Sequence, residues 1–321
     1  MTQTEELRIR AGDSTLTGTL VRPDGEGRHP WALLVPSWLP RDRDGGWDRG
    51  RHPAWFAPPG RDEPSGPLAR LADALAAVRI ASLRVDPRGC GRSDGTWGAT
   101  SLFTRIDDAR DAVGAMRSRA ELDLRRTAIV GHGEGAVVAL SVAIGDPAIG
   151  LVGLLGTPAR SLPTVWRRGA ALRALDAAHH AHPLVAALDR FAEPILEAVE
   201  RHEPTIEVEV AGEPITLDLA AWDQGAHTPV IALATMLHRA VVLAHGSADA
   251  WVDPSESILL ADVLRDGGND PLLLPLPGAG HDLGEADDAA IASIASAMAD
   301  RLEARELPPV LLAIEEMGGP H

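Results

Sequence analysis

A glycine-rich turn is the first place where this sequence could do chemistry. Gly131-His132-Gly133-Glu134-Gly135 follows a short apolar run and precedes a longer one, an order that predicts a strand, a sharp turn and a helix. In the same context, G-x-S-x-G turns present a nucleophilic serine above a sheet. Here the central residue is glycine, which has no side-chain oxygen to carry an acyl group. A phosphate-binding turn is the alternative, but neither G-x-x-x-x-G-K-[ST] nor a full G-x-G-x-x-G is present.

An acid and a histidine follow the turn at the ends of later apolar runs. Asp249 comes after the run from Val241 to Ala244, and His281 lies in a glycine-rich loop after the last such run. A carboxylate that orients an imidazole makes it a general acid or base even where no nucleophile is present. Asp253 competes with Asp249 for this role, but its place before Pro254 favours the start of a helix.

Apolar runs of strand length alternate with helical patterns along most of the chain, as in a mainly parallel sheet with crossover helices. Two amphipathic runs near the N-terminus predict an antiparallel opening. We expect an α/β core domain at residues 1–157 and 237–321, with a helical cap inserted at residues 158–236 that contains a hairpin of TIEVEV and ITLDL. The expected strands are Trp31 to Val35, Ile80 to Val85, Thr127 to Val130, Gly150 to Leu155, Ala240 to Ala244 and Leu272 to Leu276, and the expected helices include Leu68 to Val78, Leu102 to Arg119 and Ala289 to Arg305.

The order of turn, acid and histidine resembles that of the catalytic residues in α/β-hydrolases. Within that superfamily the chain is most similar to bacterial acyl esterases, whose first loop reads G-S-G-P-x-D-R-D-G and whose fourth strand leads into D-x-R-G-x-G-x-S. Here these segments read Pro36-Ser37-Trp38-Leu39-Pro40-Arg41-Asp42-Arg43-Asp44-Gly45 and Asp86-Pro87-Arg88-Gly89-Cys90-Gly91-Arg92-Ser93. The resemblance covers nearly the whole chain. It implies an α/β-hydrolase fold in which glycine at position 133 replaces the nucleophilic serine.

The resemblance also implies an oxyanion hole. In the family, one backbone amide comes from the residue after the nucleophile, here Glu134, and another comes from the loop after the third strand, here Ser37 and Trp38. The hydroxyl of Ser37 could also replace the missing nucleophile. The alternative is a structural loop serine whose hydroxyl binds the backbone. Cys90 occupies a variable family position with no base assigned to it, so we expect it to be inert. His132 is expected to pack beneath the turn.

Composition narrows the classes of partner. A formal charge of −16 disfavours nucleic acid, and the single cysteine excludes an intrachain disulfide. No apolar run reaches about 18 residues and the N-terminus lacks a signal-peptide pattern, so we expect a cytoplasmic protein without membrane contact. We expect no cofactor and no metal. The histidines at 179, 180 and 182 lack a metal-ligand spacing, and Asp107, Asp108 and Asp111 are expected to form ion pairs with Arg105 and Arg110 on a solvated helix face.

Three functions fit these residues. The first is an enzyme in which Asp249 and His281 perform general acid/base chemistry on a small acyl or carbonyl substrate: epimerisation, elimination, cyclisation or direct attack of water. The second is a serine esterase inactivated by an experimental serine-to-glycine substitution at position 133. The third is a pseudo-hydrolase that binds a ligand without turnover. The retained acid and histidine favour the first.

Overall fold

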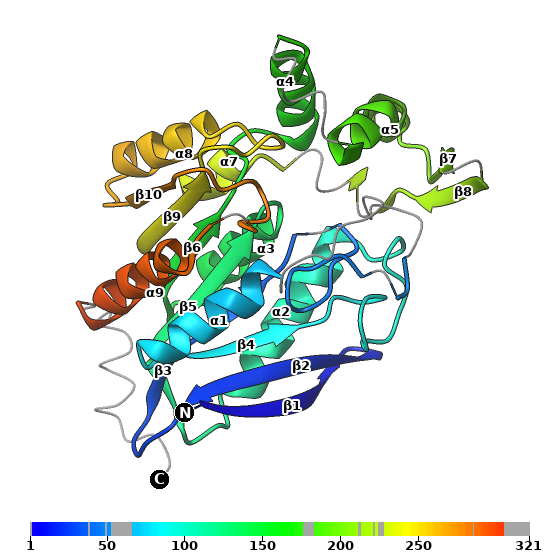
Figure 1. Cartoon of the computed structure of the whole chain (residues 1–321). Coiled ribbons are helices and arrows are strands. Elements are labelled where there is room, and N and C mark those ends of the chain that lie inside the picture. Colours follow the sequence, from blue (N-terminus) through cyan, green and yellow to red (C-terminus); the bar gives the residue numbers. More distant parts are fainter. Residues whose placement is uncertain are drawn as a thin grey trace.

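The computed structural model describes residues 2–37, 39–48, 50–52, 66–175, 183–210, 213–220, 222–223, 228–284 and 286–304. Its centre is an eight-stranded sheet in the order β1-β2-β4-β3-β5-β6-β9-β10 (Figure 1). β2 pairs antiparallel with β1 and β4, and the other neighbours in the sheet pair parallel. The strands are β1 (Thr2–Ala11), β2 (Ser14–Pro23), β3 (His29–Val35), β4 (Ala81–Val85), β5 (Leu122–His132), β6 (Ile149–Leu155), β9 (Ala240–Gly246) and β10 (Leu272–Leu276).

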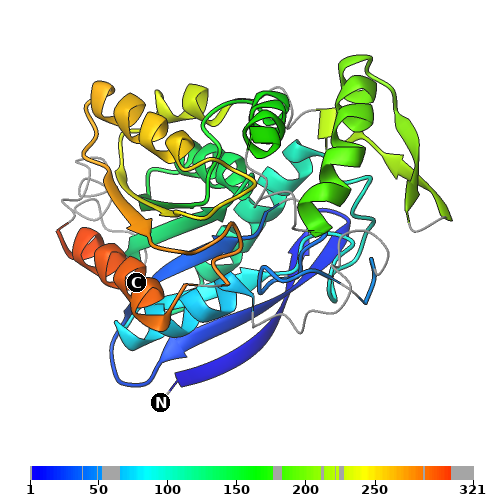
Figure 2. The ribbon, with the colours of Figure 1, turned by 45° about the horizontal axis from the view of Figure 1, so that its top comes forward.

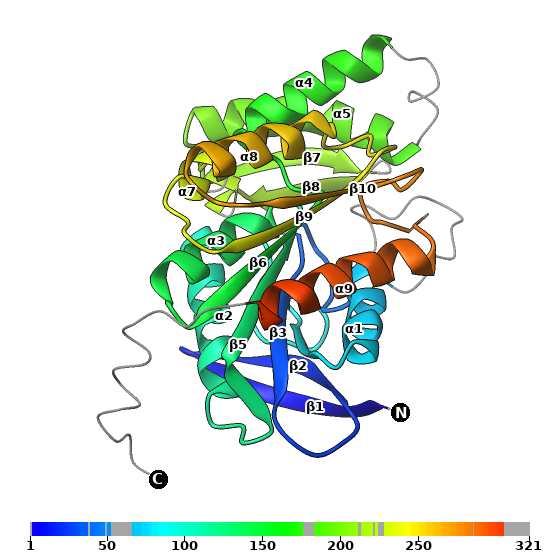
Figure 3. The same cartoon turned by 90° about the vertical axis from the view of Figure 1, so that its left-hand side faces the viewer.

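Helices cover both faces of this sheet (Figure 3). Alternate side chains of β3 enter different cores, because Leu33 packs with α2 and α3 whereas Leu34 packs with α1 and α9. Strands that are buried on both faces read as continuous apolar runs, which is why the sequence predicted them, and the α/β-hydrolase fold is confirmed. On one face α1 (Pro67–Ala77) lies beside α9 (Asp288–Glu303) (Figure 2), and on the other are α2 (Leu102–Met116), α3 (Gly135–Gly145), α7 (Val230–Ala234) and α8 (Ser255–Asp266).

The segment between β6 and β9 contains α4 (Leu162–Leu175), α5 (Pro183–Glu200), β7 (Thr205–Val210) and β8 (Glu213–Asp218). β7 and β8 pair antiparallel as a separate two-stranded sheet, which confirms the predicted hairpin. Figures 1 and 3 show these elements together at the end of the molecule away from β1 and β2. The segment is not wholly separate from the sheet domain, because α7 packs against α3 and α8.

An aromatic cluster joins this segment to loops of the sheet domain. Trp222 and the partly buried Trp166 pack in one apolar cluster with Trp47 and Trp97, which lie in the loops that follow β3 and β4. The ring centroids of Trp97 and Trp222 are 6.4 Å apart, and those of Trp166 and Trp222 are 5.5 Å apart. This shared core fixes the inserted elements over the loops at the carboxyl end of the strands.

β10 has the predicted bounds, whereas β5 begins earlier than predicted. β10 contains Pro275, which a strand tolerates because β10 is an edge of the sheet. β5 begins at Leu122 rather than Thr127, with a register shift between Thr127 and Ala128. No helix in the described part of the chain is long and apolar enough to cross a membrane.

Candidate active site

The glycine-rich turn lies between β5 and α3. Gly133 has a left-handed backbone with φ of +53°, which a sharp strand-to-helix turn requires. A Cβ atom at Gly131 would lie 2.6 Å from backbone atoms of Ala136, and one at Gly135 would lie 2.6 Å from the carbonyl oxygen of Pro36. Close backbone packing therefore requires the two outer glycines. At Gly133 the nearest neighbours of a Cβ atom would be side-chain atoms.

The structure brings His281 and Asp249 together beside this turn. Nδ1 of His281 lies 2.8 Å from Oδ2 of Asp249. The other ring nitrogen, Nε2, lies 3.1 Å from the position that a Cβ atom would take at Gly133. Among the described residues, Nε2 of His281 has no hydrogen-bond partner. The carboxylate therefore holds one side of the imidazole, and the other side faces the space above Gly133.

Burial and charge set the protonation state of this pair, whose members are 8% (His281) and 7% (Asp249) exposed. Burial would raise the pKa of Asp249, but the charges and hydrogen bonds of His281 and His245 hold that pKa well below its usual range. Burial lowers the pKa of His281, and the Asp249 carboxylate more than reverses this, so that the pKa rises to about 9. At neutral pH the pair is therefore a carboxylate and an imidazolium, and the imidazolium can donate a proton.

Two backbone amides and a second histidine fix the Asp249 carboxylate. Its Oδ1 accepts hydrogen bonds from the amides of Trp251 at 2.8 Å and Val252 at 2.9 Å. Nε2 of His245 lies 3.2 Å from Oδ2 of Asp249. Hydrogen bonds to both oxygens stabilise the charged form, so the carboxylate stays ionised and directed at His281.

An aromatic ring packs on the imidazole of His281, and an ion pair fixes the residue next to it. The Trp251 ring stacks on the His281 ring at a centroid distance of 5.8 Å and an interplanar angle of 14°, and an aromatic face stabilises a cation. The neighbouring Asp282 binds Arg41 through contacts of 2.9 and 3.0 Å, and Arg41 lies 3.7 Å over the Trp47 ring. Sequence reasoning missed Trp251 and Arg41, although one lies two residues after the acid and the other in the D-R-D-G loop.

The loop after β3 contributes a hydroxyl to the same space. Oγ of Ser37 donates a 2.6 Å hydrogen bond to Oε2 of Glu134 and lies 3.3 Å from the Cβ position of Gly133. The described residues offer no hydrogen-bond partner to the backbone amides of Ser37 and Glu134, so both amides remain candidate oxyanion donors. Trp38, the other expected donor, lies outside the described residues.

The two motifs of the resemblance tie the loops after β3 and β4 together. Oδ1 of Asp86 accepts the amide of Arg43 at 2.8 Å, and its Oδ2 accepts the Arg43 guanidinium at 2.6 Å and the amide of Arg92 at 2.9 Å. Asp44 pairs with Arg84 at 2.5 Å. These residues thus position the loop that carries Ser37 rather than contact the space above Gly133.

The competing acid and the histidine of the turn take structural positions. Oδ1 of Asp253 accepts the amide of Ser255 at 3.0 Å, at the start of α8. His132 is buried beneath the turn, with Nε2 3.0 Å from the carbonyl oxygen of His281. Burial lowers the pKa of His132 to about 4, so its neutral ring donates to that carbonyl and supports the His281 loop.

One group outside the pair has the residue types of a metal site. Ligand atoms of Asp48, His52 and Cys90 lie within 4.8 Å of one another. The Asp48 oxygens accept the amides of Arg51 at 3.2 Å and Gly91 at 2.7 Å. Burial raises the pKa of the Cys90 thiol to about 12, which keeps it protonated and unreactive. The group therefore stabilises the loops that contain its residues. The histidines at 179, 180 and 182 lie outside the described residues.

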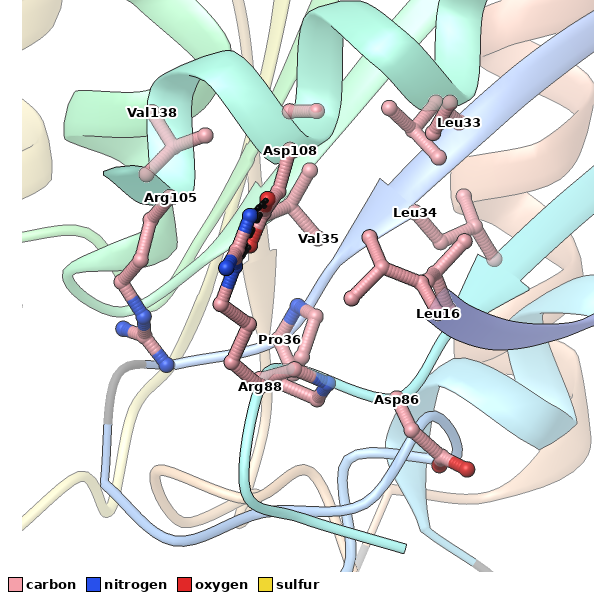
Figure 4. Close-up of a pocket in the computed structure, with 14 residues that line it drawn as sticks. Leu16, Leu33, Leu34, Val35, Pro36, Asp86, Arg88, Arg105, Asp108 and Val138 are labelled. Atoms are coloured by element: carbon pink, nitrogen blue, oxygen red, sulfur yellow. Dashed lines mark hydrogen bonds and ion pairs between the residues drawn. The ribbon is translucent and has the colours of Figure 1, made fainter. Parts of the chain in front are cut away.

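A cavity of about 60 Å³ lies behind the loop after β3, beside β4 and α2 (Figure 4). In it Arg88 binds Asp108 through contacts of 2.8 to 3.0 Å. Asp108 is only 8% exposed, so the prediction that it lies on a solvated helix face is wrong. Its ion pair with Arg88, in the loop after β4, stabilises its buried position. Arg105 lies apart from this pair (Figure 4). Burial lowers the pKa of Arg105 to about 10, and the charges of Asp108 and Glu134 oppose that shift.

Comparison with known proteins assigns the family. A family model for serine aminopeptidases, S33, matches residues 55–285 of the chain. The chain belongs to this family. No curated protein matches this S33-family sequence.

Solved structures share the fold of this S33-family chain. Est1E from Butyrivibrio proteoclasticus with bound ferulic acid has a TM-score of 0.63 at 14% identity, with 92% of this chain and 99% of that chain covered. The α/β hydrolase GrgF from Penicillium sp. sh18 has a TM-score of 0.62 at 16% identity, covering 94% and 100%. The esterase domain of a Rhodothermus marinus protein has a TM-score of 0.57 at 17% identity, covering 94% and 99%. At these identities the likeness is one of fold.

Proposed function

We propose that this protein is an α/β-hydrolase-fold enzyme in which Asp249 and His281 transfer protons on a small acyl or carbonyl substrate above Gly133. One observation carries the proposal: Nε2 of His281 lies 3.1 Å from the Cβ position of Gly133, and Asp249 lies 2.8 Å from Nδ1. A group so placed can reach a substrate atom or a water molecule beside the turn. Because Gly133 has no side chain, no acyl-enzyme forms at that residue.

The rate enhancements that are possible without a serine at position 133 indicate which reactions the site can catalyse. Loss of a serine nucleophile costs on the order of 10⁶ in turnover, and oxyanion donors with substrate binding retain about 10³ to 10⁴ over water. A well-placed acid or base contributes about 10² to 10⁴. These values favour reactions that depend on proton transfer: epimerisation or elimination beside a carbonyl, cyclisation, or attack of water on a reactive ester or lactone. The amides of Glu134 and Ser37 would stabilise the oxyanion.

The substrate class follows from what surrounds the pair. We propose that residues 158–236 form a cap over the pair. Trp166 and Trp222 of that segment belong to the same apolar cluster as Trp47. The ring centroid of Trp47 lies 6.5 Å from that of Trp251, the residue that stacks on His281. An aromatic and apolar surface of this kind favours a small organic substrate over a polyanion. The esterase domain among the similar structures makes an acyl compound the first class to assay.

The test is turnover of a panel of activated esters, lactones and thioesters by matched variants. We expect His281→Ala to lose at least about 10² in kcat/KM, whereas His238→Ala, which removes an exposed histidine, keeps the rate. An unchanged rate for His281→Ala would refute the proposal. Ligand binding without turnover by the unaltered protein would instead support a pseudo-hydrolase. Sequencing the gene decides whether glycine at 133 is natural.

A further inference from the structure

Two polar atoms from distant parts of the chain border the space that a side chain at position 133 would occupy. Nε2 of His281 lies 3.1 Å from the Cβ position, and Oγ of Ser37 lies 3.3 Å from it. Ser37 is therefore the hydroxyl that stands closest to the place of the missing one. Its Cβ atom also lies 3.4 Å from that position, so the side chain of Ser37 fills part of the space that Gly133 leaves.

Glu134 is placed as a base for this hydroxyl. The 2.6 Å distance from Oγ of Ser37 to Oε2 of Glu134 is that of a hydroxyl bound to a carboxylate and of a nucleophile bound to its base. Ser37 is 1% exposed and Glu134 is 9% exposed. Water is thus largely excluded from the bond.

The surroundings of Glu134 are unusual for a carboxylate that only supports structure. Among the described residues, Ser37 is the single hydrogen-bond partner of its carboxylate, and no arginine forms an ion pair with it. A buried charge costs free energy unless several partners compensate it, and such local costs concentrate at functional sites. Arg105 acts on Glu134 only through longer-range charge; Figure 4 shows its side chain reaching toward the loop of Pro36.

We propose that Ser37 is the nucleophile of this enzyme toward acyl substrates, with Glu134 as its base and His281 as the acid that protonates the leaving group. This inference rests on the proposed function and narrows it to acyl transfer. It moves the covalent step from the turn to the loop after β3. Position 133 then serves to leave room for the substrate between the hydroxyl and the imidazolium.

The bonds and protons balance over two steps. In the first, Oγ of Ser37 bonds to the acyl carbon, its proton passes to Glu134, and the bond to the leaving group breaks while Nε2 of His281 donates a proton to that group. In the second, water attacks the acyl carbon and the now neutral His281 takes a proton from that water. The carboxylic acid leaves as Oγ of Ser37 recovers its proton from Glu134. The sum is hydrolysis, and all three side chains return to their starting states.

Covalent labelling tests the assignment directly, because Gly133 offers no competing oxygen. The protein is treated with a fluorophosphonate probe, whose phosphorus bonds to Oγ as fluoride leaves, and the modified residue is mapped by mass spectrometry of peptides. We expect the label on Ser37. Labelling should disappear in Ser37→Ala and slow by at least about 10²-fold in Glu134→Gln, while Ser118→Ala, which changes an exposed serine, labels as the unaltered protein does.

His281→Ala separates this inference from the proposed function. Fluoride leaves without a proton, so His281→Ala should still be labelled on Ser37 although it loses ester turnover. If ester turnover depends on His281 but Ser37 is never labelled, the nucleophile is not Ser37 and the proposed function stands. If neither labelling nor turnover occurs in the folded protein, both fail. Labelling that persists in a folded Glu134→Gln variant at the full rate overturns the role of Glu134.

Discussion

Replacement of Asp249 by asparagine tests the protonation state on which the proposed chemistry depends. Asparagine keeps the size of the side chain and can still bind the amides of Trp251 and Val252, but it carries no charge. In the unaltered protein the carboxylate raises the pKa of His281 to about 9, against burial. Without that charge, burial is opposed only by the smaller effects of the Asp282 and Glu134 charges. We therefore expect the pKa of His281 in Asp249→Asn to fall to the ordinary 6.5 or below.

The size of the effect follows from the structure. The rise from 6.5 to about 9 corresponds to about 3 kcal/mol of preference for the imidazolium. A charge pair whose atoms are 2.8 Å apart in a buried site supplies several kcal/mol at an effective dielectric constant of about 20, enough to exceed the cost of burial. In turnover, loss of the orienting acid should cost about 10² to 10⁴ in kcat.

NMR titration of ring-labelled histidines measures the pKa directly. His281→Gln assigns the signal, and His132 is told apart from it because burial lowers the pKa of His132 to about 4 in the parent protein. Asp262→Asn, a change of an exposed acid, is the matched variant. A pKa of His281 at or below 6.5 in the parent protein, or an unchanged value in Asp249→Asn, would show that the Asp249 carboxylate does not keep His281 protonated.

Three further results follow. In a Ser37→Ala background, where Ser37 offers no competing hydroxyl, Gly133→Ser should gain hydrolysis of activated short-chain esters by at least about 10²-fold relative to Ser37→Ala alone, after a small shift of the His281 ring that its Cβ would meet at 3.1 Å; a folded but silent variant would show that the oxyanion loop has also changed. Asp86→Ala should lower the unfolding free energy by about 3 to 5 kcal/mol, since Arg43 loses its buried partner; a loss below 1 kcal/mol in urea titration contradicts this. The combined contribution of His132 and His281 to stability should also peak near pH 6.5, while Asp42, whose pKa burial raises to about 6, opposes the acid limb because its folded carboxyl binds a proton there. As the pH falls below 6.5, His132 binds a proton in the unfolded state but not in the folded state, where its pKa is about 4. As the pH rises above 6.5, His281 loses its proton in the unfolded state but keeps it in the folded state, where its pKa is about 9. Each effect removes about 3 kcal/mol, and His132→Gln should flatten the acid limb.

The sequence could predict what depends on local pattern. Buried parallel strands are apolar along their length, so β3, β4, β6 and β9 were visible as runs. The glycines at 131 and 135 were visible because close backbone approach excludes other residues. The choice of Asp249 over Asp253 followed from the place of Asp253 before Pro254, which favours the start of a helix, and the structure places Asp249 against His281 and Asp253 at the start of α8.

The sequence could not predict contacts between distant segments. Ser37 and Glu134 are 97 residues apart in the chain, and no periodic pattern relates a loop serine to the residue after a turn. The same holds for Arg41 with Asp282 and for Arg88 with Asp108, where an acid that falls on a helix pairs with a distant loop arginine. Such pairs form only once the sheet has brought the carboxyl ends of its strands to one edge.

Chemical rescue of His281→Ala by free imidazole tests whether the imidazole beside Gly133 transfers protons during turnover. The variant removes the imidazole beside Gly133 and leaves a space that a free imidazole can enter, with Asp249 still in place to orient it. We expect turnover to fall by at least about 10²-fold and added imidazole to restore a saturable part of it, with no rescue in the double variant that also carries Asp249→Asn. Full turnover by His281→Ala without imidazole would show that His281 transfers no proton in the reaction.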